Sequence, residues 1–471
     1  MQTRYTSADQ WAEAKDGVIP APYALEEGEQ IIDQYLEPVI FHNVNGPDIG
    51  VTTCGVIVKD GLYFKDLDNS GELAPYKDWR LSPEQRAEDM VKHLRLDQQA
   101  GLVLNTLFNT PVVPTRAEAT NAEGKLELGK IYKHHNPDEK PMPGPLPGMT
   151  VSIDDSHVLE KHIAAGVYRG DMRCEAGMVA LYHNAGTQML EYEACKGGVA
   201  IPYSLHTNPI NIGYPDSLGI GAAVIGDGNT DMVYEMAQTD RKMMKAEGLN
   251  IMYGPQVDVT SDPRWPRTSG TYGERPDVTS DIAEALVKGY QDGDNGLNEG
   301  SVVLTIKHFP GDAPSENGFE PHVPIGQWRI YRTPGSMEKY HLPPFQRAFD
   351  HKVSSIMPDY SRIATDGRAV PQTYRGEVTS TEEVPSAYSK ELITDLARNK
   401  MGFDGYVNSD SGITTVQIYG VENLTEPERY AKAISAGTDV IGGNTDPENI
   451  VKAVEDGLLP KADLDRASYN R

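Results

Sequence analysis

Short apolar runs rich in β-branched residues recur along the chain from Leu81 onward. Because each run is brief and largely free of charged residues, the runs are typical of parallel strands that are covered on both faces. They span residues 101–105, 199–203, 249–253, 302–306, 353–357, 405–409 and 438–442. The pattern therefore predicts a parallel sheet in which these runs are buried strands.

Segments with helical periodicity separate the runs. Residues 281–291 place their apolar side chains on one stripe, and Ser389 can cap a helix that ends near Gly402. Residues 445–448, Thr-Asp-Pro-Glu, combine a capping residue with a first-turn proline. Because strand and helix patterns alternate, we predict an α/β fold. The number of runs favours a (β/α)8 TIM-like barrel, and a three-layer sheet is the alternative.

The pattern also divides the chain. Residues 1–80 carry short alternating runs such as Gly55-Val-Ile-Val-Lys and are predicted to form a small β-rich extension, with the catalytic barrel over 81–471. Residues 136–148 are rich in proline and glycine, which predicts a loop. The last residues, 463–471, have a helical pattern that runs to the final position. We therefore expect a further segment on the C-terminal side, in the parent gene or in a partner chain.

Composition limits the classes of partner. The chain of 471 residues has 38% hydrophobic and 24% charged residues, which is typical of a soluble globular protein. Its 43 basic and 69 acidic residues give a formal charge of −26, and such a charge disfavours nucleic acids and anionic membranes as partners. The pattern leaves homo-oligomer formation open.

Cysteines and apolar stretches add little to this picture. Cys54, Cys174 and Cys195 match no zinc-ligand spacing, and their odd number favours free thiols. We find no apolar run long enough to span a bilayer and no signal peptide at the N-terminus. Localisation stays open: cytoplasmic, or periplasmic or secreted if a leader was removed.

Polar residues follow several of the predicted strands, where the active sites of α/β barrels form. Because the carboxyl ends of the strands converge, we expect these side chains to line one pocket. Such a mixture of charged and neutral groups suits a neutral polyhydroxyl ligand, whose hydroxyls need both donors and acceptors. The candidate residues are Asn208, Arg267, Lys307, His308, Tyr360 and Asp410.

Four segments, in order along the chain, make the sequence resemble glycoside hydrolase family 3. Residues 306–312, Ile-Lys-His-Phe-Pro-Gly-Asp, contain a Lys-His-Phe motif. Residues 261–267, Ser-Asp-Pro-Arg-Trp-Pro-Arg, precede Tyr-Gly-Glu at 272–274. Residues 356–360, Ile-Met-Pro-Asp-Tyr, and 402–410, Gly-Phe-Asp-Gly-Tyr-Val-Asn-Ser-Asp, complete the series. The resemblance covers the chain from about Leu81 to its end and implies a catalytic barrel that hydrolyses β-glycosides.

The resemblance also assigns roles. It implies that Asp410 is a nucleophile that forms a glycosyl-enzyme and gives retention of configuration, whereas position alone leaves open a helix cap. It implies that Lys307, His308 and Arg267 hold sugar hydroxyls and that the Tyr360 hydroxyl lies near the nucleophile. Position alone leaves open that Lys307 and His308 cap neighbouring carbonyls at the strand end and that Tyr360 is a core residue. Arg264 is expected in a structural ion pair.

Three departures from the family pattern bear on function. Asn208 stands where an aspartate is usual, and Ser411 where tryptophan is frequent. We expect this chain to lack the C-terminal α/β domain that supplies an acid/base glutamate in two-domain members of the family. Single-domain β-N-acetylglucosaminidases use a loop histidine instead. Here the loop 311–325 contains Glu320-Pro-His322, so His322 is the candidate acid/base, and a histidine at the pocket rim is the alternative.

No cofactor is predicted, and one segment bears on metal binding. Residues 66–72, Asp-Leu-Asp-Asn-Ser-Gly-Glu, begin like a calcium loop, but Lys77 stands where a bidentate carboxylate belongs. A surface turn is therefore favoured over a calcium site.

These observations predict a retaining exo-β-glycosidase that releases terminal non-reducing β-D-glucose from β-linked oligosaccharides or aryl glucosides. A β-xylosidase or a β-N-acetylglucosaminidase would use the same scaffold, and a transglycosylase would use the same residues. The alternative from another class is a non-catalytic sugar-binding or scaffold subunit. A second chain or domain could also supply the acid/base glutamate.

Overall fold

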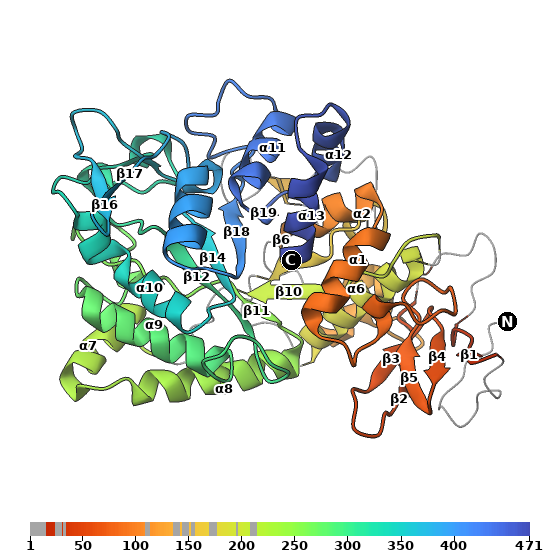
Figure 1. The fold of residues 1–471 in the computed structure, drawn as a ribbon. Helices are drawn as coiled ribbons and strands as arrows, with labels where there is room; N and C mark the ends of the chain where they lie inside the picture. The colour runs from red at the N-terminus through yellow and green to blue at the C-terminus, as the bar shows by residue number, and fades with distance from the viewer. Residues whose placement is uncertain are drawn as a thin grey trace.

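The computed structural model describes residues 16–23, 31, 34–108, 114–134, 142–143, 150–151, 156–168, 177–194, 196–207 and 214–471. Parallel strands form a closed barrel in which neighbours follow one another in chain order (Figure 1). The strands are β6 (Leu104–Phe108), β9 (Ala165–Tyr168), β10 (Ser204–Thr207), β11 (Ile251–Met252), β12 (Val303–Phe309), β14 (Ser355–Pro358), β18 (Tyr406–Ser411) and β19 (Val440–Gly442). Pairing of β19 with β6 closes the ring, with Ile441 opposite Leu104. The predicted (β/α)8 barrel is therefore confirmed.

Two barrel strands differ from the sequence prediction. The run 199–203 is not a strand, because β10 begins only at Ser204. Pro202 lies within the run, and proline lacks the N–H that a sheet ladder needs. The strand β9 was not among the predicted runs. It contains Ala165 and Gly166, whose small side chains give a weak apolar signal.

Helices surround the barrel (Figure 1). They include α2 (Leu96–Leu102), α6 (Met178–Ala194), α7 (Ser217–Asp227), α8 (Asp231–Glu247), α9 (Pro276–Tyr290), α10 (Pro343–Asp350), η9 (Glu391–Lys400), α11 (Glu426–Ala436), α12 (Pro447–Glu455) and α13 (Lys461–Asn470). The helix predicted over 281–291 is the C-terminal part of α9, which buries Ile282 and Leu286. The Ser389 hydroxyl accepts a hydrogen bond from Leu392 N at 3.3 Å, so the predicted cap forms at the start of η9.

Small antiparallel sheets precede the barrel. One contains β1 (Val18–Ile19), β4 (Val56–Lys59) and β5 (Leu62–Lys65), and the other pairs β2 (Val39–Phe41) with β3 (Ile49–Val51). Both sheets share a core that includes Phe41, Val51 and Val56. The helix α1 (Pro83–His93) follows, starting at a Ser82 cap.

The N-terminal sheets are attached to the barrel through polar contacts. Glu191, on α6, is buried and forms an ion pair with Lys65. Its carboxylate also accepts a hydrogen bond from the Thr52 hydroxyl at 2.8 Å. Nearby, Ala200 N donates to Leu67 O at 2.8 Å, just ahead of β10. These contacts join the extension to the side of the barrel formed by α6 and β10.

Several predictions fall partly outside the described residues. Of the predicted loop 136–148, only Met142–Pro143 is described with secondary structure, as β7, which pairs with β8 (Thr150–Val151). Cys174 and Cys195 lie outside the described residues, while Cys54 is buried. Among the helices that the structure describes, none has the length and apolarity that a membrane crossing requires.

Candidate active site

Asp410 lies at the carboxyl end of β18, beside the ends of the neighbouring strands. Its side chain is 13% exposed, and its Oδ2 lies 3.7 Å from Nε2 of His308 on β12. Ser411 N donates to Asp410 Oδ1 at 2.7 Å, which fixes the rotation of the carboxylate. On the β19 side the backbones approach closely, because a Cβ at Gly442 would lie 2.7 Å from Ser409 O. The strand end therefore holds one carboxylate oxygen and leaves the other facing His308.

The charges around Asp410 keep it ionised. Burial alone would raise the pKa of this carboxyl group, but the positive charges of His308, His322 and Lys307, with the Ser411 N–H, bring it below its ordinary value. An aspartate with a lowered pKa is fully charged at neutral pH. It can therefore act as a nucleophile or as an electrostatic partner of a cation.

Tyr360 follows β14 and lies against the same carboxylate. Its hydroxyl donates to Ser411 O at 2.7 Å. Burial, then the negative charge of Asp410 and a hydrogen bond to it, raise the pKa of the Tyr360 phenol well above its usual value. The phenol therefore stays protonated, with its hydroxyl next to Asp410.

Lys307 and His308 lie at the end of β12 and contact different partners. Lys307 Nζ donates to Tyr253 O at 2.7 Å and lies over the Tyr253 ring. His308 is buried, with Nδ1 2.9 Å from Asp258 Oδ2. Its Nε2 lies 3.2 Å from a guanidinium nitrogen of Arg267. The structure thus brings Arg267, Lys307 and His308 to the rim around Asp410.

A buried ion-pair network supports these groups. Asp258 is completely buried and accepts a hydrogen bond from Asp312 N at 2.6 Å, in addition to its contacts with His308. Asp312 forms ion pairs with Arg267 and with buried Arg329, on β13 (Trp328–Arg329). Burial would raise the pKa of Asp258, but His308, the N–H of Asp312 and the charge of Arg267 bring it below its ordinary value. Through Asp258 and Asp312, this network fixes the positions of the His308 and Arg267 side chains.

Arg329 extends the network to the next strand end. It forms an ion pair with Asp359, which follows β14, as well as with Asp312. Asp359 also accepts hydrogen bonds from Ser361 N and from the Ser386 hydroxyl, each at 3.0 Å. No sequence pattern indicated this role for Asp258, Asp312, Arg329 or Asp359. Asp258 and Asp312 lie within or next to the quoted motifs, whereas Arg329 lies in no motif.

The same network bears on metal binding. Ligand atoms of Asp258, His308 and Asp312 lie within 4.8 Å of one another, a spacing that could hold an ion. However, backbone N–H groups and His308 use the oxygens of Asp258, and two arginines use those of Asp312. Because the arginines already neutralise these carboxylates, the donor set does not fit a metal ion.

A second polar network fills the barrel beneath Asp410. Asn105, from β6, donates to Asn408 Oδ1 at 2.8 Å. Asn408 donates to the Tyr253 hydroxyl at 2.6 Å, and that hydroxyl donates to Ser409 O at 3.2 Å. These residues connect the ends of β6, β11 and β18, so they hold the strand that carries Asp410.

His322 lies on the loop that connects β12 to β13, and it reaches the site. Its Nδ1 contacts Glu320 Oε1, and its ring meets the Tyr360 ring edge-on with centroids 4.9 Å apart. Glu320 Oε1 lies 3.9 Å from a guanidinium nitrogen of Arg267. Burial would raise the pKa of Glu320, but the hydrogen bond to His322 and the charge of Arg267 lower it. A charged glutamate therefore faces one ring nitrogen of His322.

The segment that follows β18 contacts the loop that carries His322 and holds it in place. The Tyr419 hydroxyl donates to Pro321 O at 3.0 Å, and Gln417 donates to His322 O at 3.5 Å. Gly326 permits a close chain crossing, because a Cβ there would lie 2.1 Å from Glu320 O. The position of His322 is thus set by packing as well as by Glu320.

Two other predicted residues have different outcomes. Asn208 lies outside the described residues, so its predicted role stays a prediction. Arg264 points to solvent and forms a two-pronged ion pair with Asp262. The structural role expected for Arg264 is therefore present.

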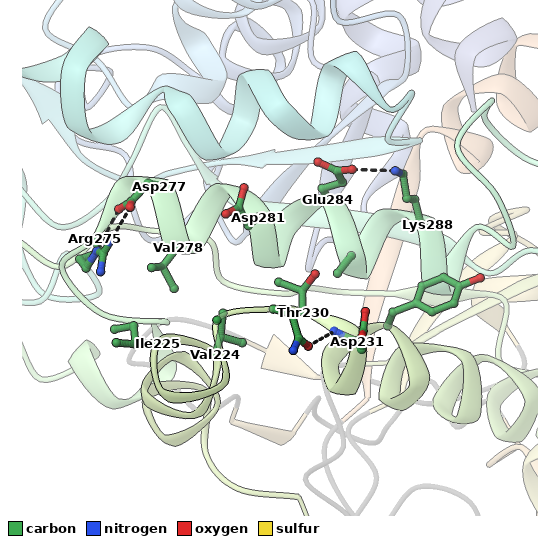
Figure 2. A pocket seen from close by; sticks show the side chains of 14 residues that line it. Val224, Ile225, Thr230, Asp231, Arg275, Asp277, Val278, Asp281, Glu284 and Lys288 are labelled. Carbon is green, nitrogen blue, oxygen red and sulfur yellow. Dashed lines mark hydrogen bonds and ion pairs between the residues drawn. The ribbon is translucent and has the colours of Figure 1, made fainter.

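A separate groove of about 600 Å³ lies between α7, α8 and α9 (Figure 2). Charged side chains along it pair with one another, Arg275 with Asp277 and Glu284 with Lys288. None of the predicted site residues lines this groove. The candidate active site is therefore the mouth of the barrel.

Curated relatives are similar over most of the chain. A periplasmic β-glucosidase/β-xylosidase of Dickeya chrysanthemi is 30% identical over 452 residues, which are 88% of this chain and 62% of the relative. A β-glucosidase C of Emericella nidulans is 33% identical over 302 residues, which are 59% of this chain and 46% of the relative. The chain therefore spans less than two thirds of these proteins.

Solved structures are similar in fold. A β-glucosidase from Erythrobacter marinus has a TM-score of 0.63 at 22% identity, covering 84% of this chain and 45% of that chain. A glycoside hydrolase family 3 β-N-acetylglucosaminidase from Paenibacillus has a TM-score of 0.57 at 20% identity, covering 79% of this chain and 61% of that chain. At these identities the likeness concerns the fold.

The family model for the glycosyl hydrolase family 3 N terminal domain matches residues 195–470, more than half of the chain. The match includes the strands β10 to β19 and every described candidate residue. The family model and the Dickeya relative both match this chain over more than half of its length. The chain therefore belongs to glycosyl hydrolase family 3.

Proposed function

We propose that this chain is a retaining exo-β-glycosidase that releases terminal non-reducing β-D-glucose from β-glucosides, with Asp410 as the nucleophile. The observation that carries the proposal is a partly exposed carboxylate at a strand end whose pKa is lowered by surrounding cations. An ionised carboxylate beside a protonated tyrosine and several sugar-compatible donors is the arrangement that attack on an anomeric carbon requires.

The chemistry proceeds in two steps. Asp410 Oδ2 attacks the anomeric carbon, the bond to the glycosidic oxygen breaks, and an acid protonates the leaving oxygen. Water then attacks the glycosyl-enzyme, gives its proton to the same group acting as a base, and releases the sugar with retained configuration. Ser411 N and Tyr360 hold the carboxylate in position during both steps.

The sugar would be bound by the cationic rim. Lys307, His308 and Arg267 present N–H donors to hydroxyl groups, and the network behind them fixes their directions. Preorganised donors cost little reorganisation when the substrate binds. Asn208, the residue that follows β10 in the sequence, is proposed as a neutral acceptor for a further hydroxyl.

The proposed general acid/base is His322. The carboxylate of Glu320 faces Nδ1, which leaves the other ring nitrogen to exchange a proton with the substrate. A glutamate from a second domain or a partner chain is the alternative donor, and the longer relatives make that alternative relevant.

Glucose is proposed because several relatives are named as β-glucosidases. The Dickeya relative is also named as a β-xylosidase, so xylosides are the second candidate. Substrates of the β-N-acetylglucosaminidase type are the third, supported by the loop histidine and by the fold of the Paenibacillus enzyme. Nitrophenyl derivatives of these sugars, compared at one enzyme concentration, would rank them.

The test of the proposal replaces the nucleophile. Asp410→Asn should lower kcat for nitrophenyl β-glucoside by about 10³-fold or more, because an amide cannot form the glycosyl-enzyme. A 2-fluoro-glucoside should add one sugar mass to the wild-type chain and none to the variant. Asp262→Asn, which alters a half-buried carboxylate paired with exposed Arg264, is the matched control.

Equal rates for wild type and Asp410→Asn would reject the assignment of the nucleophile. A wild-type chain that binds sugars but yields neither turnover nor a covalent adduct would support the sugar-binding alternative instead. Transfer of the sugar to added alcohols in preference to water would identify a transglycosylase.

A further inference from the structure

The segment 66–77, between β5 and α1, has the ligand spacing of a calcium loop. In such a loop, positions 1, 3 and 5 supply side-chain oxygens, position 7 a backbone carbonyl and position 12 a bidentate carboxylate, with glycine at position 6. Here these places hold Asp66, Asp68, Ser70, Glu72 and Lys77, and the glycine is Gly71. The twelfth residue is of the wrong type, since it carries a positive charge, and the ninth, Ala74, offers no side-chain ligand.

The backbone of the segment is folded as a closed loop. Gly71 has φ +75°, in the left-handed region that glycine adopts without strain. Its N–H donates to Asp66 Oδ2 at 2.8 Å, and Ser70 N donates to Asp68 Oδ1 at 2.9 Å. These bonds turn the first two carboxylates inward, toward one point.

The ammonium of Lys77 occupies that point. Lys77 Nζ donates to Asp66 Oδ1 at 2.6 Å, to Ser70 Oγ at 2.8 Å and to Glu72 O at 2.9 Å. It also contacts Asp68 Oδ1. The Lys77 side chain is 0% exposed, so the favoured surface turn is corrected to a loop closed around a buried cation.

The charges agree with the geometry. Two inward carboxylates would repel each other if no cation separated them. Burial raises the pKa of Asp66 in spite of its bonds from Lys77 and Gly71, whereas at Asp68 hydrogen bonds from Lys77 and Tyr76 outweigh burial and bring the pKa well below its ordinary value. A buried lysine is retained as an ion only with such partners, because an isolated buried ammonium is strongly disfavoured.

We propose that residues 66–77 form a calcium-type loop whose cation is the chain's own ammonium, at Lys77. The loop is closed by this internal ion and needs no bound metal. Because Leu67 O accepts from Ala200 N, and Lys65 next to the loop pairs with Glu191, the closed loop holds the N-terminal sheets on the barrel. The inference does not depend on the proposed catalytic activity.

The test exchanges the internal cation for an external one. Lys77→Glu restores the carboxylate at the twelfth position, and Lys77→Gln removes only the charge. Thermal unfolding of the full chain is followed in EDTA and in millimolar CaCl2. The wild type should have the same Tm in both, whereas Lys77→Glu should unfold earlier in EDTA and regain at least ~3 °C with Ca²⁺. Lys59→Glu, at the exposed end of β4, is the matched charge control and should show no Ca²⁺ response.

The possible results separate the alternatives. A Ca²⁺-dependent rise in the wild-type Tm would overturn the proposal, since the metal would then compete with Lys77. A folded Lys77→Glu chain that ignores Ca²⁺ would overturn it as well. If Lys77→Glu does not fold in either buffer, Lys77→Gln decides: stabilisation by Ca²⁺ supports the proposal, and its absence rejects it. Adding Asp66→Asn to the responding variant should abolish the response.

Discussion

At the scale of single residues, the protonation of Asp410 is set by its neighbours. Its exposed fraction is small, so burial alone would favour the neutral acid, yet His308, His322 and Lys307 reverse that preference. The candidate nucleophile is therefore charged because the end of β12 and the loop that follows it deliver positive groups to it. This arrangement predicts how activity depends on pH.

The acid limb of activity should lie at low pH. Because the pKa of Asp410 is below its ordinary value, the carboxylate stays ionised as pH falls and is protonated only below the usual aspartate range. The measurement is kcat/KM for an activated aryl glycoside against pH, with circular dichroism at each pH to confirm folding. An acid limb centred above the ordinary aspartate pKa would contradict the assignment.

Asp258 is predicted to be a positioning residue. Asp258→Asn removes the charge that faces His308 Nδ1 and replaces an acceptor oxygen by an NH2 group, so His308 and Arg267 should shift. We expect kcat/KM to fall roughly 10²-fold, as for a small misplacement of binding groups. The loss should appear as a higher KM and as weaker inhibition by free glucose.

The control for this prediction is Asp262→Asn, which lies on the same loop but pairs only with exposed Arg264. Assays are run well below the Tm of each variant, so that stability is not limiting. An Asp258→Asn variant with an unchanged KM and glucose inhibition would show that the network has only a structural role.

At the scale of elements, the loop between β12 and β13 brings the candidate acid/base to the barrel mouth. Sequence placed His322 beside Glu320, but its distance from Tyr360 depends on packing against Tyr419 and Gln417. Strand prediction from sequence is limited in the same way, because some strands also depend on tertiary contacts. The runs that became β12, β14 and β18 were recognised by their apolar patterns, whereas β9 was missed because its small residues acquire strand structure only from their neighbours.

Removing His322 should affect substrates according to their leaving groups. With His322→Ala, a poor leaving group loses its proton donor, so we expect kcat for methyl β-glucoside to fall ~10²-fold or more. A dinitrophenyl glucoside leaves without protonation and should be affected far less in the first step. Equal losses for both substrates would favour a glutamate from another domain or chain as the acid.

At the scale of the whole molecule, attachments between distant segments decide how the site is held. Arg329 connects the strand ends of β12 and β14 through Asp312 and Asp359. The loop 66–77 and Glu191 attach the N-terminal sheets to the barrel, at a place remote in sequence from Arg329 and its partners. The ion pairs of Arg329 are buried, and so is Glu191 in its pair with Lys65, so removal of one partner would leave an uncompensated charge. Such buried ion pairs fix the relative positions of the segments that they join, and they add little to the net stability of the fold.

The sequence by itself determined the barrel, the order of its main strands and the segments that hold the candidate site, because apolar runs and local motifs are properties of neighbouring residues. It also placed Asp410, Tyr360, Lys307 and His308 at strand ends. Only the tertiary structure decided that Asp258 and Arg329 fix these groups and that Lys77 closes a calcium-type loop. Those roles depend on distances between residues remote in sequence and on burial, which makes each charge require a partner.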